Sequence, residues 1–423
     1  MPTTKGHAAR DFYAAGLAAA EAGRHADAIA AYEHALAQAP GDARVLFALG
    51  NTAAELGHLE AAERFFRQVL AQTPDRVEAL VNLANLLRKR GRTADVIALL
   101  RPALGRNPQA GELWLTLGSA MREAGDANTA EIFTREALRL SPDSTAALGN
   151  LGDLLADNGA IDESLALYAQ AIAQQPENAQ ARLNRAILFL LQGNLQQGWR
   201  DYEYRLRIKA RAISADHGLP QWDGIYTDGL RLLITAEQGI GDQLMFASVI
   251  PELAARLAQC GGQTILETEP RLVPLLGRSF PSVCVRPAKI ERRGAQLFAH
   301  YDWLQEQGTH AAIALGSLPA LMRKDLLDFP RPHSYLLADS VERTGWTRWL
   351  RAQGNGPFIG ICWRSGSLGG LRNLQYAPLE AWADFLRDLP GTFVCTQYDA
   401  QAEEIAALQR LSGRTILDRK SVV

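Results

Sequence analysis

Small and apolar residues recur with a period of 34 residues through the first half of the chain. Within each period a small residue is followed by an aromatic or apolar residue and then by another small one. The spacing of four and then three residues places all three on one face of a helix. The clearest examples are Ala28/Tyr32/Ala35, Ala62/Phe66/Val69, Val96/Leu100/Ala103 and Ala130/Thr134/Ala137.

Glycines and prolines follow the same period. Glycine is typical of the residue that closes a helix, and proline of the point where the chain leaves one. The pattern therefore predicts paired antiparallel helices that stack as an α-solenoid over residues 1–206, and it matches that of tetratricopeptide repeats. We expect five full repeats from about residue 9 to 178 and a sixth, variant repeat to about 206. The positions in phase are Gly23, Gly57, Gly91, Gly125, Gly159 and Gly193, and Pro40, Pro74, Pro108, Pro142 and Pro176.

Such an array coils into a superhelix with a concave face, and asparagines fall on one face of its first helices. One position carries Asn82, Asn150 and Asn184, and another, three residues on, carries Asn51 and Asn85. Amide side chains both donate and accept hydrogen bonds, so they can hold an extended peptide from a protein partner. The alternative is a solvated surface. Similar asparagine ladders occur in the repeat domain of protein O-GlcNAc transferases, although Ala48 and Thr116 interrupt this one.

The sixth repeat contains Trp199, Tyr202 and Tyr204, which predict a buried junction with the next domain rather than a ligand site. Residues 207–229 have no clear period and are interpreted as a linker.

From residue 230 onward, short apolar runs alternate with helical patterns, which predicts βαβ units and parallel sheets. Pro251 should interrupt the first helix of this region. A first Rossmann-like lobe is expected over residues 230–340 and a second, partial one over 341–423.

Composition narrows the classes of function. The net charge of −2 gives no global basic surface for nucleic acid. The four cysteines lie far apart without metal-ligand spacing, so reduced thiols and no metal are expected. No run approaches the roughly 18 to 20 apolar residues of a membrane span, and the N-terminus lacks the apolar core of a secretory signal. These features predict a cytoplasmic protein.

The run "AEQGIGDQLMFA", residues 236–247, follows an apolar strand and predicts a strand, a tight turn and a helix. Gly239 and Gly241 fit a dinucleotide-binding turn, but Leu244 stands where that motif needs a third glycine. Asp242 would meet a bound phosphate with a negative charge. Either the turn is structural, or this carboxylate has a role of its own.

Five motifs occur in order: "GWRDYEYRLR", "PQWDG", "AEQGIGDQLMFA", "LGSLPAL" and "GICWRSG". Together they resemble bacterial proteins in which tetratricopeptide repeats precede a glycosyltransferase domain similar to the heptosyltransferases (glycosyltransferase family 9). The resemblance extends to about residue 417. It implies a GT-B fold with two Rossmann-like lobes, an acceptor mainly on the first, a nucleotide-sugar donor mainly on the second, and neither metal nor other cofactor.

The resemblance also assigns candidate residues. In related heptosyltransferases an aspartate directly after a glycine in the first turn is the general base, and Asp242 after Gly241 matches it. A base must take the proton of the acceptor hydroxyl, and a helix N-terminus favours an ionised carboxylate. The alternative is that Asp242 only caps the helix. Glu237 is either a second carboxylate at the mouth of the site or a solvated acid.

The diphosphate leaving group needs cations and backbone donors when no metal is present. Arg364, Ser365 and Gly366 end the first strand of the second lobe, where doubly wound folds place ligands, and Arg372 in a glycine-rich loop can close over them. The alternative is a surface arginine beside a turn.

The second lobe lacks the downstream donor-binding segment of the family, so we expect a truncated lobe and an inactive chain. The preferred function is a glycosyltransferase whose repeats recruit a protein acceptor or partner. The rival is a non-catalytic repeat scaffold with a degenerate or truncated glycosyltransferase domain. The sequence names neither the sugar, the nucleotide nor the acceptor.

Overall fold

The computed structural model describes most of the chain, and its contacts group the chain into two compact units. One unit is Gly159–Gly356, and the other comprises Met1–Asn158 and Pro357–Val423. No helix in the described part of the chain is both long and apolar enough to cross a bilayer. The described residues are 4–208, 213–215, 217–237, 239–293, 296–304, 308–330, 334–366 and 376–419.

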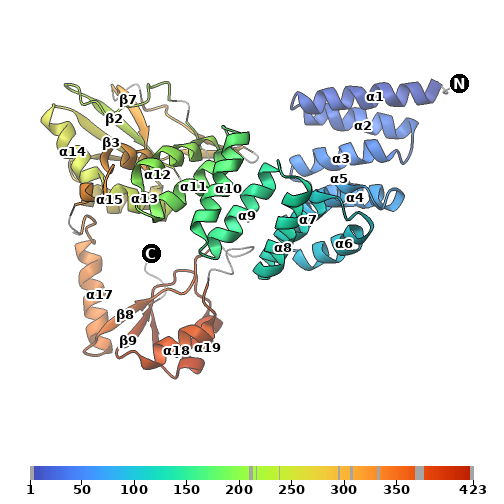
Figure 1. Cartoon of the computed structure of the whole chain (residues 1–423). Coiled ribbons are helices and arrows are strands. Elements are labelled where there is room, and N and C mark those ends of the chain that lie inside the picture. Colours follow the sequence, from blue (N-terminus) through green and yellow to red (C-terminus); the bar gives the residue numbers. More distant parts are fainter. Residues whose placement is uncertain are drawn as a thin grey trace. The chain divides into compact units, whose positions relative to one another are not determined.

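Helical hairpins occupy residues 4–202 and follow one another in the order that the period predicts (Figure 1). Six pairs of helices are present over this range, including the sixth, variant repeat. The pairs are α1 (Thr4–Glu21) and α2 (His25–Gln38), α3 (Ala43–Glu55) and α4 (Leu59–Gln72), α5 (Val77–Lys89) and α6 (Thr93–Arg106), α7 (Gly111–Glu123) and α8 (Ala127–Leu140), α9 (Thr145–Asp157) and α10 (Ile161–Gln174), and α11 (Ala179–Leu191) and α12 (Leu195–Tyr202).

The glycines of the repeats have two structural roles. Those between the two helices of a pair adopt positive φ, for example 79° at Gly57 and 69° at Gly91, where a side chain would be strained. Gly50, inside α3, instead faces the buried ring of Phe66. A β-carbon at residue 50 would lie 2.6 Å from Phe66 Cε1, so only glycine allows this approach.

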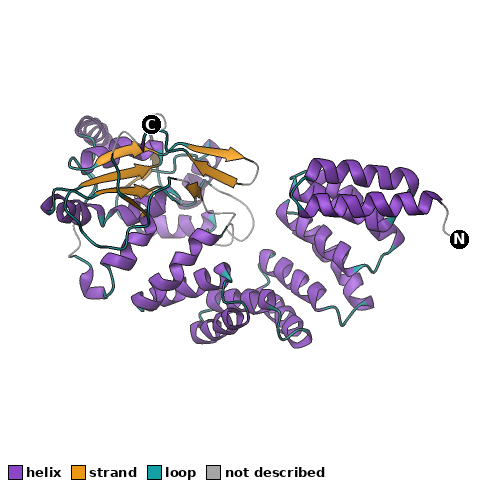
Figure 2. Ribbon diagram, turned by 90° about the horizontal axis from the view of Figure 1, so that it is seen from above, coloured by secondary structure: helices purple, strands orange, loops and turns teal. Residues whose placement is uncertain are grey.

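A four-stranded parallel sheet follows the repeats in the sequence, and all strands of the described chain come after residue 202. Figure 2 shows the strands in orange and the helices in purple. The order of this sheet is β4-β3-β2-β7. The chain runs outward from β2 through β3 to β4 and then returns to place β7 on the other side of β2. Ligands of open α/β sheets bind at the carboxyl edge where the order reverses, here beside β2. The strands are β2 (Arg231–Thr235), β3 (Gln263–Thr268), β4 (Cys284–Pro287) and β7 (Ala311–Ala314).

Alternate residues of these strands face two separate cores. Leu232 and Ile234 pack in one core with apolar residues of α13 (Ile240–Ala247), α14 (Ile250–Gln259) and α15 (Val273–Ser279). Leu233, between them, faces a second core on the other side of the sheet, which contains Trp303. Pro251 lies in the first turn of α14 and separates it from α13, so the predicted interruption is confirmed.

The segment interpreted as a linker contributes to this lobe. β1 (Ile213–Ala215) pairs in parallel with β6 (Gln296–Ala299), which pairs antiparallel with β5 (Ile290–Arg293). Further along, Trp222 is buried, and its backbone N–H donates to the Ala312 carbonyl at 2.8 Å. The linker interpretation is corrected for these residues, whose partners lie some 80 residues or more away and leave no local period.

A smaller parallel sheet near the C-terminus has the order β10-β9-β8. Strands and helices alternate in this region, as the pattern from residue 230 onward predicts. The parallel sheets bear out the α/β alternation, whereas the two-lobe GT-B arrangement stays a prediction. The elements are α17 (Ser340–Gln353), which precedes the sheet, β8 (Phe358–Ile361), α18 (Leu379–Asp388), β9 (Thr392–Cys395), α19 (Ala402–Ser412) and β10 (Ile416–Asp418).

Candidate functional site

Asparagines from two adjacent repeats line a cavity of about 310 Å³. Asn82 on α5 donates through Nδ2 to Asn51 Oδ1 on α3 at 2.8 Å. Asn85, one helical turn from Asn82, lines the same cavity together with the exposed charges Glu55 and Lys89. The structure therefore brings three of the five predicted groove asparagines together.

The same arrangement recurs two repeats later. Asn150 on α9 donates to the Ser119 hydroxyl on α7 at 3.0 Å, and both line a cavity of about 150 Å³. Ser119 occupies the repeat position held by Asn51, so the polar contact between first helices is periodic. Arg88 pairs with Glu123 at 2.7 Å beside it. This face is therefore polar and cross-linked from repeat to repeat.

The inter-repeat bond uses only part of each amide. An asparagine offers two N–H donors and two acceptor sites. The bond between Asn82 and Asn51 takes one donor of the first and one acceptor site of the second. Asn85 accepts from Arg88 at 3.1 Å, and Asn184, on the last repeat, accepts from Gln180 at 2.6 Å. Among the described residues, Asn51 keeps its N–H donors and Asn82 its acceptor sites for a peptide backbone, which can pair with both.

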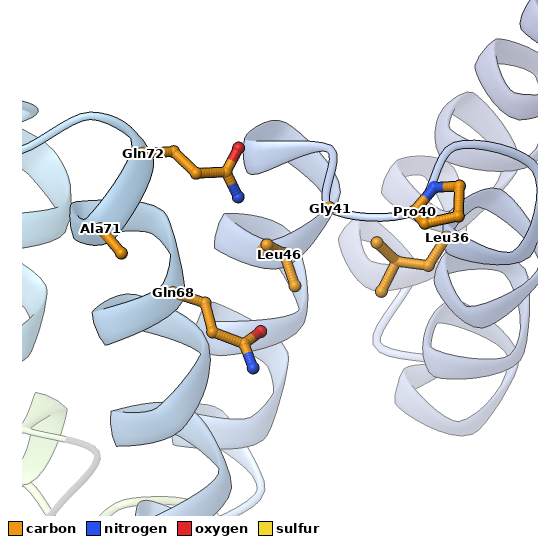
Figure 3. Close-up of a pocket in the computed structure, with 7 residues that line it drawn as sticks. All are labelled: Leu36, Pro40, Gly41, Leu46, Gln68, Ala71 and Gln72. Atoms are coloured by element: carbon orange, nitrogen blue, oxygen red, sulfur yellow. The ribbon is translucent and has the colours of Figure 1, made fainter.

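A larger, open depression of about 540 Å³ lies where the first repeat meets the second (Figure 3). Leu36 of α2 and Leu46 of α3 line it, with Gln68 and Gln72 of α4 (Figure 3). It contains none of the predicted site residues and no titratable side chain. It offers an apolar surface with two amides but no group for catalysis.

The turn after β2 is a capped helix start. Gly239 is the N-cap residue of α13, and its N–H donates to Asp242 Oδ2 at 3.2 Å. Asp242 is half-buried, and no atom beyond its chain neighbours and the backbone of α13 lies within 4 Å of the position that a β-carbon of Gly241 would take. The capping role of Asp242 is therefore present in the structure. It leaves the other carboxylate oxygen for a second partner, so a general-base role stays a prediction.

A buried ion network fills the β2–β7 side of the carboxyl edge. Arg205, in the short 3₁₀ helix η1 (Glu203–Arg207), donates to Glu237 at 2.6 and 3.0 Å and to the Ser317 hydroxyl at 2.8 Å. Glu237 also accepts the Gly316 N–H at 2.7 Å. The solvated alternative for Glu237 is thus wrong, because its carboxylate is buried and paired, whereas its role as a second carboxylate of the site stays a prediction. The motifs "GWRDYEYRLR", "AEQGIGDQLMFA" and "LGSLPAL" meet in this network.

The aromatic residues of the sixth repeat behave in two ways. Trp199 donates through Nε1 to the Arg323 carbonyl at 2.8 Å, and Trp199 and Tyr202 both pack against the core of the sheet lobe. The predicted junction is confirmed for these two. Tyr204 instead lies beneath the guanidinium group of Arg182, 4.3 Å from the ring centroid.

Glu267, at the end of β3, was not singled out from the sequence. Only 1% of its surface is exposed. Its Oε2 accepts the Ala236 N–H at 3.2 Å and the Tyr301 hydroxyl at 3.4 Å, while Oε1 has no hydrogen-bond partner among the described residues. Burial raises the pKa of Glu267 to about 7. The sequence could have indicated Glu267 only through its position at the carboxyl end of a predicted parallel strand.

Arg364 lies at the end of β8, as predicted, but its guanidinium group is already neutralised. It donates to Asp399 at 2.8 Å and forms two bonds of 2.8 Å to Glu404. These bonds hold the pKa of both carboxyls below their ordinary values. A phosphate would have to compete with two carboxylates. Ser365 and Gly366 follow Arg364, whereas Arg372 lies outside the described residues, so the cradle stays a prediction.

Metal ligation has no candidate in the described ranges, because no cluster of three His, Cys, Asp or Glu side chains occurs there. The chemistry that the described side chains offer is hydrogen bonding along the repeats and carboxylates at the edge of the four-stranded sheet.

Family models match the repeats. Residues 19–86 match one tetratricopeptide repeat model, and residues 81–145 and 146–212 match another. The N-terminal region is therefore a tetratricopeptide repeat array, as predicted. The chain is 33% identical over 231 residues to Protein FlbA of Caulobacter vibrioides, which is 54% of this chain and 38% of that protein. The chain thus spans little more than a third of this relative's length.

Solved structures also resemble part of this chain. A thermophilic tetratricopeptide repeat protein of Thermus thermophilus is 27% identical, with a TM-score of 0.38, and is covered completely by 43% of this chain. The structure of pilF from Pseudomonas aeruginosa is 19% identical, with a TM-score of 0.42, and the match covers 49% of this chain and 93% of pilF.

Proposed function

We propose that the repeat array binds an extended segment of a protein partner, and that the α/β region transfers a sugar from a nucleotide-sugar to that partner or to an acceptor it brings. The binding role rests on one observation: amides of adjacent repeats, bonded to each other, line a cavity and keep donors and acceptors for a peptide backbone. Solenoid repeats of this class use such surfaces to hold partners.

The catalytic role rests on the ordered motifs and on the carboxyl edge of the parallel sheet. Asp242 lies in the turn after β2, at the point where the strand order reverses. There its carboxylate would accept the proton of the attacking hydroxyl. The oxygen would then form a bond to the anomeric carbon as the diphosphate leaves with the bonding electrons. Neither a metal nor another cofactor is required by this proposal.

Peptide binding is tested with a phage-displayed library of random decapeptides selected on the full chain. Affinities of the selected peptides are then measured by calorimetry. The double variant Asn51→Ala/Asn82→Ala should bind at least roughly tenfold more weakly, because one or two backbone hydrogen bonds are lost. The matched control is Asn128→Ala, which removes an exposed amide from α8. If the double variant and the control bind the peptides with equal affinity, the asparagines are only solvated surface residues and do not hold the peptide.

The same preparations separate the enzyme from the scaffold. They are titrated with UDP-, GDP-, ADP- and CMP-sugars, and transfer to the selected peptides is followed by mass spectrometry. Specific binding of one donor supports a glycosyltransferase, and transfer is measured in parallel on a longer relative that carries the matching aspartate. Peptide binding without any donor binding or transfer would instead favour the non-catalytic repeat scaffold.

A further inference from the structure

Glu267 is a buried carboxyl that the proposed function does not use. It lies at the carboxyl end of β3, directly beneath the start of the 236–242 turn, where Ala236 donates to its Oε2. Tyr301 supplies a second, longer hydrogen bond to the same oxygen. The other oxygen, Oε1, is buried and has no partner in the described ranges. Buried carboxylates are normally paired with a cation or fully hydrogen-bonded.

The titratable side chains that lie near Glu267 on β4 and in the segment around Tyr301 do not neutralise its carboxylate. Arg286 is paired with Glu267 in the register of β3 and β4, but its guanidinium group stacks over the Trp303 ring, 4.4 Å from the centroid. His217 meets the Tyr301 ring edge-on at 5.5 Å. Burial and the nearby Glu267 raise the pKa of Tyr301 above its ordinary value, so it stays a neutral donor.

The charged groups of the neighbouring turn are engaged elsewhere. Glu237 is paired with Arg205, and Asp242 accepts the Gly239 N–H. No basic side chain in the described part of the chain forms an ion pair with Glu267. An ionised Glu267 therefore remains an uncompensated buried charge, which is unfavourable.

We propose that Glu267 is a proton switch beneath Ala236, the first residue after β2: the protonated carboxyl stabilises the packed, closed edge of the sheet, and the ionised carboxylate loosens the residues that cover it. The ionised carboxylate gains free energy only when Oε1 reaches water. Ala236 and the segment around Tyr301 cover the carboxylate of Glu267, so they must move before water can reach Oε1. The device acts on the turn that carries Asp242, and it does not depend on glycosyl transfer.

The direction of the pH effect follows from burial. The folded carboxyl holds its proton up to a pKa of about 7, whereas its ordinary value is 4.5. The closed form thus binds more protons than the open form between these values, and its stability falls as the pH rises through that window. Above about pH 7 Glu267 is ionised in both the closed and the open form, so the stability of the closed form falls no further.

Hydrogen exchange of the full chain, followed by mass spectrometry and normalised to the unfolded chain, tests this switch. In the wild-type protein, protection of the 236–247 peptide should fall roughly tenfold between about pH 6 and pH 8. Glu267→Gln keeps the shape and an acceptor for Ala236 but cannot ionise. Its protection should change less than about threefold over the same range. An equal fall in both proteins would overturn the proposal.

Glu269→Gln is the matched control, two residues further along the chain. Glu269 is more exposed, and hydrogen bonds from Arg271 hold its pKa below the ordinary value, so it is ionised throughout the range. This variant should keep the wild-type pH profile. A second measurement applies if Glu267→Gln does not fold: carbon-13 NMR of glutamate-labelled wild-type protein should show one carboxyl titrating near 7. If every carboxyl titrates below about 5.5, the idea fails, since an ordinary pKa means a solvated oxygen.

Discussion

Single glycines decide how tightly the two helices of a repeat pack. At Gly50 the ring of Phe66 occupies the space of a side chain, and at Gly118 the Thr134 hydroxyl would lie 2.8 Å from an added β-carbon. Gly149, in the first helix of a later repeat, has nothing within 4 Å of that position. Glycine is therefore required by close packing at Gly50 and Gly118. At Gly149 it has no packing role and is only a weak helix former.

Gly50→Val should destabilise the array by about 1–3 kcal/mol, because Phe66 must leave its packed position. Gly149→Ala should instead stabilise it by about 0.5–1 kcal/mol, because alanine is the better helix former in an open position. Urea denaturation monitored by circular dichroism measures both. A Gly50→Val protein as stable as the wild type would mean that Phe66 repacks freely.

Asp242 combines a visible capping role with a proposed catalytic one, and one substitution separates them. In the Asp242→Asn variant the side-chain amide would still accept the Gly239 N–H but would not take a proton, so the melting temperature should stay nearly unchanged. In a longer relative that transfers sugar and carries the matching aspartate, the same substitution should lower the transfer rate by about 10²–10⁴-fold with little change in donor affinity. A rate within a few-fold of wild type would show that Asp242 only caps α13.

The short helix η1 joins the last repeat to the sheet lobe through one guanidinium group. Arg205 has only 3% of its side chain exposed and contacts elements that follow β2 and β7. Arg207, two residues on, pairs with Glu177 at the surface, with more than half of each side chain exposed. Burial distinguishes the two arginines, although both form ion pairs.

Removing one partner from the buried pair leaves the other charge without compensation. Arg205→Met should therefore destabilise the lobe by about 3–5 kcal/mol, whereas Arg207→Met should cost less than about 1 kcal/mol. Chemical denaturation followed by tryptophan fluorescence reports on the lobe through Trp222 and Trp303. Similar losses for both variants would contradict a special role for the buried network.

Across the whole molecule, the repeats and the sheet lobe are stabilised by contacts of different range. Hydrogen bonds between first helices join residues 31 apart, as between Asn82 and Asn51. In the lobe, Arg205 and Ser317 are 112 residues apart. An array built from contacts between neighbouring repeats is stable without distant parts of the chain.

A fragment of residues 1–206 should accordingly fold alone as a helical solenoid, with a strongly helical circular dichroism spectrum. Trp199 and Tyr202 pack against the lobe core in the intact chain, so the fragment should also expose an aromatic face and bind a hydrophobic dye. A spectrum without strong helicity would contradict the independence of the array.

The repeat period, the helix ends, the positions of the groove asparagines and the alternation of strands and helices could all be predicted from the amino-acid pattern. These features are local: a glycine with positive φ or a small residue facing a ring recurs every 34 residues and is visible as a pattern. The positions of Asp242 and Arg364 at strand ends were predictable for the same reason.

Tertiary structure alone decided which of these side chains are available. It paired Glu237 with Arg205, surrounded Arg364 with two carboxylates, and buried Glu267 beneath the turn with one oxygen that has no partner among the described residues. It also drew the segment interpreted as a linker into the lobe through β1 and Trp222. The physical reason is that burial and charge compensation depend on which strands become neighbours. That order joins residues far apart in the chain and leaves no periodic signal.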